Sequence, residues 1–406
     1  MLFDPSAHEP LTDDPWDEAR VRAAVREIVA EVDRGYDARA GSWRLHPLDA
    51  GEEDDDDAGV SHGVYIGAAG MLWGLDHLAR AGAAESSLDL SAAAVGLHDG
   101  YLRRCHAPEE PMPSLWVGES GIHLVAETIA PGSSGSARTD ALLAAVRSNA
   151  HNETLELLWG APGTMLAARE MHRRTGEERW AEAWCESADA LLSEWRFDEQ
   201  LGCHLWTQLI HGTSGRGLGP AHGFAGNVLA LVDGLDLLSA AQRDEIVRRA
   251  TGTALATAVA AEGLANWPTA AGGTVGGPGT RTQWCHGAPG IVSSLASLPP
   301  DPELDAVLAA GGELTWQAGP LTKGAGLCHG TAGNGFALLA LFARTGDEVW
   351  LERARSFAMH AVAQTNRLRS QHGTGWFGLW TGDLGTAIYA WQCISGGAAM
   401  PTLSAW

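Results

Sequence analysis

The sequence predicts an all-α protein made of seven repeated helix pairs, about fourteen helices in all. Two observations lead to this fold class. A Gly-x-x-Gly step that is followed by an apolar stretch recurs seven times along the 406 residues, at intervals of 42 to 64 residues. Self-similarity over a whole chain is typical of repeat proteins. The first glycines of the seven steps are Gly67, Gly118, Gly160, Gly223, Gly287, Gly330 and Gly382.

The residues after each step have the periodicity of an amphipathic helix. Leu72, Leu75 and Leu78 recur on one side of the first such stretch, and the stretch 164–173 alternates an Ala/Leu/Met face with a charged face. A second helix in each repeat is predicted by Ala-, Leu- and Arg-rich stretches between the steps. These include residues 140–149, 178–194, 240–260 and 348–365. A β-propeller of similar period needs four strands per repeat, and the sequence does not show them.

Helix pairs either stack into an open solenoid or close into a ring. Both arrangements bring the glycine steps to one end of the molecule. We expect one domain over residues 1–406, with the repeats at about 60–395. An N-terminal helix and an acidic loop precede them within residues 1–59, and the acidic run 52–57 is expected to be a solvated loop. Two flexible stretches, 211–220 and 272–279, precede the fourth and fifth steps and are expected to shape a site.

The composition excludes several classes of partner. Lys plus Arg number 27 against 50 Asp plus Glu, a formal net charge of −23, which argues against nucleic acid and against docking on an anionic membrane. Apolar runs such as 336–343 are too short to span a bilayer. The first 14 residues lack the pattern of a signal peptide, and the six cysteines are scattered. A cytoplasmic protein with reduced thiols is therefore expected.

Three of the steps differ from the others in residues that carry chemistry. Cys285-His286 and Cys328-His329 each stand directly before a first glycine, and His222 stands alone before another. If the steps share one end of the molecule, these side chains converge there. Two thiolates and an imidazole suit Zn²⁺, with a fourth position left open for catalysis. The alternative is a duplicated Cys-His-Gly sequence that is kept only for packing.

These motifs together resemble the lanthionine synthetase C (LanC) family, and especially its LanC-like branch. The resemblance rests on Ala221-His222-Gly223, on Trp-Cys-His-Gly-Ala-Pro-Gly from Trp284, on Cys-His-Gly-Thr-Ala-Gly-Asn from Cys328, and on Glu-Leu-Leu-Trp-Gly from Glu156. It covers residues 63–391, nearly the whole chain. The resemblance implies a closed α/α toroid of seven helix pairs with one zinc ion in its central mouth.

The resemblance also implies roles for individual residues. Cys285, Cys328 and His329 take the positions of the zinc ligands, and His222 that of a general acid/base. His286 follows the first ligand, as in LanC-like proteins, where bacterial cyclases often have Tyr.

Four further residues match positions that surround the family's zinc site. Arg281 matches a positively charged active-site position. Glu156 stands where the cyclases have Asp, which leaves its catalytic role open. Lys323 is the only lysine of the chain and matches a lysine that holds glutathione in the LanC-like branch. Arg369 is assigned a related substrate-binding part through a looser alignment.

The implied function is zinc-dependent addition of a thiol to dehydroalanine or dehydrobutyrine, which forms a thioether of the lanthionine type. The thiol belongs to a peptide cysteine or to glutathione, and the partner is a peptide or protein that contains the dehydroamino acid. The alternative is a non-catalytic scaffold that contains zinc and binds glutathione or peptide. A carbohydrate-active toroid would need paired carboxylates beside a cleft, and the Cys/Cys/His set argues against it.

Overall fold

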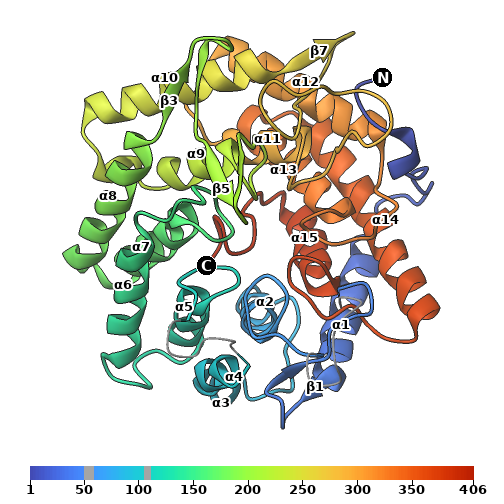
Figure 1. The fold of residues 1–406 in the computed structure, drawn as a ribbon. Helices are drawn as coiled ribbons and strands as arrows, with labels where there is room; N and C mark the ends of the chain where they lie inside the picture. Colours follow the sequence, from blue (N-terminus) through green and yellow to red (C-terminus); the bar gives the residue numbers. More distant parts are fainter. Residues whose placement is uncertain (50–58, 105–110) are drawn as a thin grey trace.

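The protein is a closed ring of helices (Figure 1) in a computed structural model that describes residues 1–49, 59–104 and 111–406. Each inner helix contacts the next, and the last returns to the first, so the ring is closed and the open solenoid is excluded. The predicted α/α toroid is thereby confirmed. The seven inner helices are α2 (Ala68–Arg80), α5 (Glu119–Ile129), α7 (Ala161–Thr175), α9 (Phe224–Val232), α11 (Ala288–Leu295), α13 (Thr331–Thr345) and α15 (Asp383–Ser395).

Outer helices surround this ring. The described residues contain fifteen α-helices instead of fourteen, because one outer position holds two short helices that meet at Gly96. The last inner helix, α15, packs against α1 from the opposite end of the chain. The outer helices are α1 (Glu18–Gly35), α3 (Leu90–Val95), α4 (Leu97–Leu102), α6 (Ala137–Asn149), α8 (Glu178–Ser193), α10 (Ala240–Thr257), α12 (Pro302–Ala318) and α14 (Glu348–His372).

The glycine steps mark the beginning of every inner helix. The first glycine of each step is the residue before the helix, and the second is its third helical residue. A Cβ on the second glycine would overlap a carbonyl oxygen of the preceding loop, that of Trp284 for Gly290 and that of Leu327 for Gly333. Each loop therefore folds back across the first turn of its helix. Gly287 also has a φ of 95°, a left-handed conformation that favours glycine.

Four short antiparallel hairpins lie in the connections. They are β1 (Tyr36–Asp37) with β2 (Ser42–Trp43), β3 (Arg196–Asp198) with β4 (Cys203–Leu205), β5 (Gln208–Ile210) with β6 (Thr213–Gly215), and β7 (Val259–Ala261) with β8 (Leu264–Asn266). The stretch 211–220 was expected to be flexible but contains β6, where Gly215 pairs with Gln208. The predicted helix 240–260 ends at Thr257, because the chain continues there into β7. The acidic run 52–57 lies outside the described residues.

A cluster of tryptophans fills the ring beneath the loops at its mouth. Trp116, Trp284 and Trp380 are fully buried. The Trp380 ring centroid lies 4.4 Å from that of Trp116 and 4.6 Å from that of Trp284. These large aromatic side chains pack closely in the centre of the toroid. The loops at the mouth are therefore supported by a packed core and do not border an open channel.

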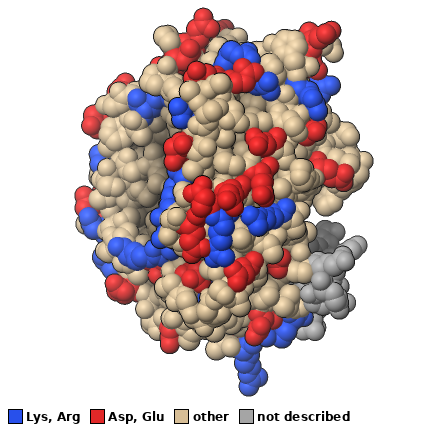
Figure 2. Space-filling model, turned by 90° about the vertical axis from the view of Figure 1, so that its left-hand side faces the viewer, with Lys and Arg blue, Asp and Glu red and all other residues tan. Residues whose placement is uncertain are grey.

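The outer surface on the side of α6 and α8 carries acidic side chains interleaved with arginines (Figure 2). Arg147, for example, lies 3.8 Å from Glu182 and 3.5 Å from Glu186. The C-terminus lies near the middle of the ring (Figure 1), where Trp406 packs edge-on against Trp73. Within the described ranges, no helix has both the length and the apolar character that crossing a bilayer requires.

Candidate functional site

A cavity of about 650 Å³ opens at the end of the ring where the inner helices begin. Six of its lining residues occupy one repeat position, two residues before the first glycine of their step. They are Tyr65, Trp116, Leu158, Ala221, Cys285 and Cys328. The next position along the chain contributes three histidines to the same cavity, His222, His286 and His329. The ring thus converts a sequence repeat into a circle of side chains around one cavity.

Backbone hydrogen bonds join the loops that carry these residues. The Cys285 amide donates to the Cys328 carbonyl over 3.0 Å, and the Cys328 amide donates to the Trp380 carbonyl over 2.8 Å. The Trp380 amide donates to Tyr65 over 3.1 Å, and the Tyr65 amide donates to Trp116 over 3.0 Å. Five loops from distant parts of the chain are therefore held in fixed positions relative to one another.

The two cysteines of the cavity are buried and interact directly. A hydrogen bond from the Cys328 thiol is the main influence that lowers the pKa of Cys285, and Gln283 and Arg281 act in the same direction. The Gln283 amide donates to Cys285 Sγ over 2.9 Å. Because Cys328 donates to its neighbour and is deeply buried, its own pKa is raised. The pair therefore favours a thiolate on Cys285.

His329 follows Cys328 directly and also lines the cavity. Burial lowers the pKa of its imidazole, Lys323 lowers it further, and the carboxylate of Asp49 opposes the change. A neutral imidazole and two buried thiols are the donor types that zinc prefers. The three donor atoms do not all lie within 4.8 Å of one another in the described structure. Their chemical types therefore suit zinc, but the three side chains would have to move closer together to bind the ion.

His222 and Glu156 form a hydrogen-bonded pair at the edge of the cavity. Glu156 is fully buried, and its carboxylate accepts from His222 Nδ1 over 2.9 Å. The same carboxylate accepts from the backbone amides of Leu158, Trp159 and Gly160. The Trp159 ring stacks on the imidazole with centroids 5.2 Å apart. These contacts fix the orientation of His222, and the longer side chain of Glu156 is no obstacle to that geometry.

Of the three predicted cationic residues, two line the cavity and Arg369 does not. Arg281 and Lys323 are exposed and line the cavity, and Lys323 Nζ donates to Gln283 Oε1 over 3.3 Å. Arg369 belongs to α14 and lies 3.6 Å from Asp383, the first residue of α15. It is not among the residues that line the cavity. Burial raises the pKa of Asp383 to about 6.

Three residues of the site were not predicted from the sequence. Tyr65 donates a hydrogen bond to the Cys328 thiol. Asp49 accepts a hydrogen bond from Trp376 Nε1 over 2.6 Å, and its charge acts on the imidazole of His329. Gln283 donates to Cys285 Sγ, as described above. The sequence could have indicated Tyr65 as a site residue, because it lies two residues before the first glycine of its step, as Cys285 and Cys328 do. Asp49 lies outside the repeats, and no sequence pattern indicates it.

Fold and site together define a seven-repeat α/α toroid with paired Cys-His loops at its mouth. A family model described as "Lanthionine synthetase C-like protein" matches residues 58–403, and the chain belongs to this family. It is 40% identical over 82 residues to LanC-like protein GCL1 of Arabidopsis thaliana, and 44% identical over 79 residues to Glutathione S-transferase LANCL1 of Danio rerio.

Each of these matched segments spans 19% of the relative, and 19% and 18% of this chain, respectively. The solved structure of a nisin cyclase superposes with a TM-score of 0.64 at 14% identity. The superposition covers 92% of this chain and 94% of the nisin cyclase chain. At this identity, the similarity to the cyclase concerns the fold alone.

Proposed function

We propose that this protein adds a thiol across the double bond of a dehydroalanine or dehydrobutyrine residue, with zinc held by Cys285, Cys328 and His329. The product is a thioether. The observation that carries the proposal is that the His222–Glu156 pair lies at the same cavity as the two thiols. A protein that only binds zinc or peptide has no need of a half-buried histidine aligned by a buried carboxylate.

Bound by these residues, zinc would deprotonate a substrate thiol at neutral pH and keep its sulfur nucleophilic. Two neighbouring side chains form hydrogen bonds to the two cysteine ligands. The Gln283 amide bonds Cys285, and the Tyr65 hydroxyl bonds Cys328. Outer hydrogen bonds of this kind orient metal ligands and limit their movement. Two thiolate ligands would also offset the double charge of the ion.

His222 is proposed to move the proton of the reaction. The sulfur bonds to the β-carbon, the double bond breaks, and the α-carbon takes up a proton. Because Glu156 accepts from Nδ1, the other ring nitrogen, Nε2, is the atom that takes the thiol proton and delivers it to the α-carbon. Arg281 lines the same cavity and would stabilise the negative oxygen of the enolate that forms between the two steps.

Glutathione is the thiol that the charges of the cavity favour. Arg281 and Lys323 present two positive charges at the cavity of a protein whose net charge is −23, and glutathione carries two carboxylates. The cavity volume of about 650 Å³ is in the ordinary range of small-molecule sites. The zebrafish relative is named as a glutathione transferase. Ring closure by a cysteine of the same peptide is the second possible use of the site.

The test incubates zinc-loaded protein with a dehydroalanine peptide and glutathione and follows the thioether by mass spectrometry. Wild type should exceed the protein-free rate. His222→Ala should slow the reaction by roughly 10²- to 10⁴-fold with zinc retained. His211 packs edge-on against the same Trp159 ring, so His211→Ala is a matched control that should change the rate little. Zinc-loaded wild type that adds no thiol to any of several peptides would favour the non-catalytic scaffold.

A further inference from the structure

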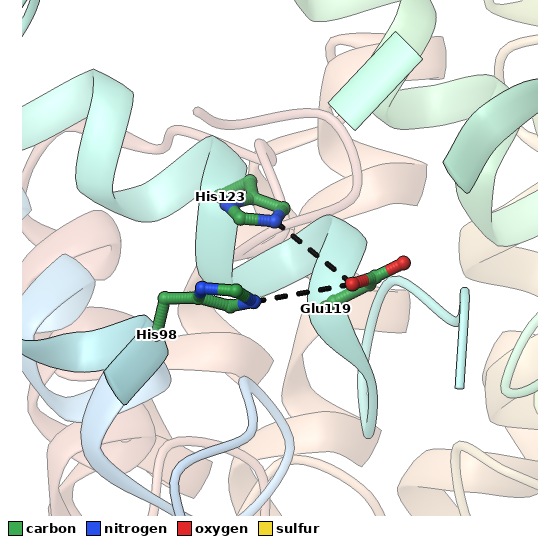
Figure 3. A group of neighbouring side chains, drawn as sticks. All are labelled: His98, Glu119 and His123. Atoms are coloured by element: carbon green, nitrogen blue, oxygen red, sulfur yellow. Dashed lines mark ion pairs between the residues drawn. The ribbon is translucent and has the colours of Figure 1, made fainter. Parts of the chain in front are cut away.

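A second cluster of metal-ligating side chains lies between α4 and α5, away from the cavity of the two thiols. His98 comes from α4, and Glu119 and His123 come from successive turns of α5 (Figure 3). His98 Nε2 and His123 Nε2 each lie 4.0 Å from the same oxygen of Glu119. All three donor atoms lie within 4.8 Å of one another. None of the three residues lines the cavity that holds Cys285.

Three of the four imidazole nitrogens of this cluster are buried without partners. His98 Nε2 and both ring nitrogens of His123 have no hydrogen-bond partner among the described residues, and the His123 side chain is only 6% exposed. A separation of 4.0 Å from Glu119 is too long for a hydrogen bond. Buried polar atoms are nearly always satisfied, so this arrangement calls for something between the nitrogens and the carboxylate.

A charged His–Glu ion pair does not explain the cluster. Burial lowers the pKa of His123 to about 3 and also lowers the pKa of His98, so both rings are neutral at neutral pH. Burial raises the pKa of Glu119. Neutral imidazoles beside a carboxylate are in the protonation state that binds a metal ion, and a bound cation would favour the ionised carboxylate.

We propose that His98, Glu119 and His123 form a second metal site, which binds a divalent transition-metal ion of the zinc type. Two histidines and one glutamate are an established donor set for zinc with one position left open. Donors at about 2.1 Å from a tetrahedral ion lie about 3.4 Å apart, so the separations of 4.0 Å need only a small closure. The spacing of Glu119 and His123, four residues apart on one helix, already places both on one face.

The surroundings are compatible with an added cation. Arg138 is the one positive side chain that influences both imidazoles, and its guanidinium lies 3.4 Å from the carboxylate of Glu127. Asp99 acts on His98 in the opposite direction to Arg138. The His98 side chain is 34% exposed, so the cluster lies close to the protein surface. The ion would tie the short outer helix α4 to the inner helix α5.

Cobalt distinguishes the two sites of this protein. The full-length protein is stripped with a chelator and titrated with Co²⁺, whose spectrum shows charge transfer only when thiolates are ligands. Wild type should bind about two ions per chain, one with thiolate charge transfer and one with ligand-field bands alone. His98→Asn and Glu119→Gln should each remove the second ion and leave the charge-transfer band unchanged. Zinc should raise the unfolding midpoint of wild type more than that of either variant.

The matched control is His77→Ala. His77 lies on α2, stacks on Trp73 and takes no part in the cluster, so this variant should bind the same number of ions as wild type. His98 is partly exposed, and its replacement by asparagine should leave the fold intact. The proposal is overturned if wild type takes up only the ion with thiolate charge transfer, or if His98→Asn and Glu119→Gln both keep the second ion.

Discussion

The central Cys285–Cys328 cluster and the peripheral His98–Glu119–His123 cluster are assembled in different ways. The central cysteines occupy the same position in two repeats, and a backbone hydrogen bond between their loops holds them side by side. The peripheral residues come from neighbouring helices within one part of the chain and occupy no equivalent repeat positions. Closure of the ring therefore matters to the first cluster, while the second needs only the local packing of α4 on α5.

The difference teaches how a repeat fold acquires chemistry. Seven similar loops meet at one mouth, so a change at a single repeat position delivers a new side chain to a shared cavity. Away from the mouth, no shared cavity brings reactive side chains together. A site there forms only where the faces of two helices happen to pack against each other. The central site is therefore expected to carry the reaction, and the peripheral site to carry stability.

Removal of a central cysteine should have the largest effect. Cys328→Ala should lower thiol addition to the uncatalysed rate and remove about one zinc ion per chain, because an open zinc site relies on each of its three protein ligands. His123→Ala should leave the rate of addition unchanged. Metal analysis and a thioether assay on both variants provide the check. The comparison fails if His123→Ala abolishes the reaction while Cys328→Ala does not.

A methyl group at the second glycine of a step should disturb the central site through its loop. Gly333→Ala would press on the Leu327 carbonyl, next to Cys328, and we expect a loss of roughly 1–3 kcal/mol in unfolding free energy together with reduced zinc content. Gly252→Ala is the control, since Gly252 is exposed in α10 with open space around it, and it should gain about 0.5–1 kcal/mol. Denaturant melts of both variants measure the difference. Equal stability of the two would contradict the role given to the loop contact.

The positioning carboxylate should have an intermediate effect. Glu156→Gln leaves a single accepting oxygen for His222 and three backbone amides, which weakens the alignment of His222, and we expect about a 10- to 100-fold lower kcat with zinc retained. Glu119→Gln, the same change in the peripheral cluster, should leave kcat as in wild type. A kcat of Glu156→Gln equal to that of wild type would contradict the positioning role given to Glu156.

The smallest effect is expected at Lys323. Lys323→Ala should raise the KM for glutathione by about tenfold, the value of one lost charge contact, and leave ring closure of a peptide nearly unchanged. Lys323→Arg should restore much of the affinity. Arg196→Ala removes an exposed positive charge outside the cavity and should have no effect. If Lys323→Ala slows both reactions equally, the lysine serves the shared chemistry rather than glutathione.

Most of the architecture was predictable because it repeats. Each Gly-x-x-Gly step marked the start of an inner helix, and the amphipathic stretches between the steps became outer helices. The split of one outer position at Gly96 was not predicted, nor was the use of α1 as the outer partner of α15. Contacts between the two ends of a chain leave no periodic pattern in the sequence.

The sequence by itself determined which residue types occupy the loops, and thus that Cys285, Cys328 and three histidines would share a mouth if the loops met. Only the tertiary structure decided that the ring closes, that Glu156 bonds His222, and that Arg369 faces Asp383 rather than the cavity. The same holds for His98, which meets Glu119 and His123 through the packing of two helices. Periodicity encodes the face on which a side chain lies, but the distance between faces of different helices depends on how the whole core packs.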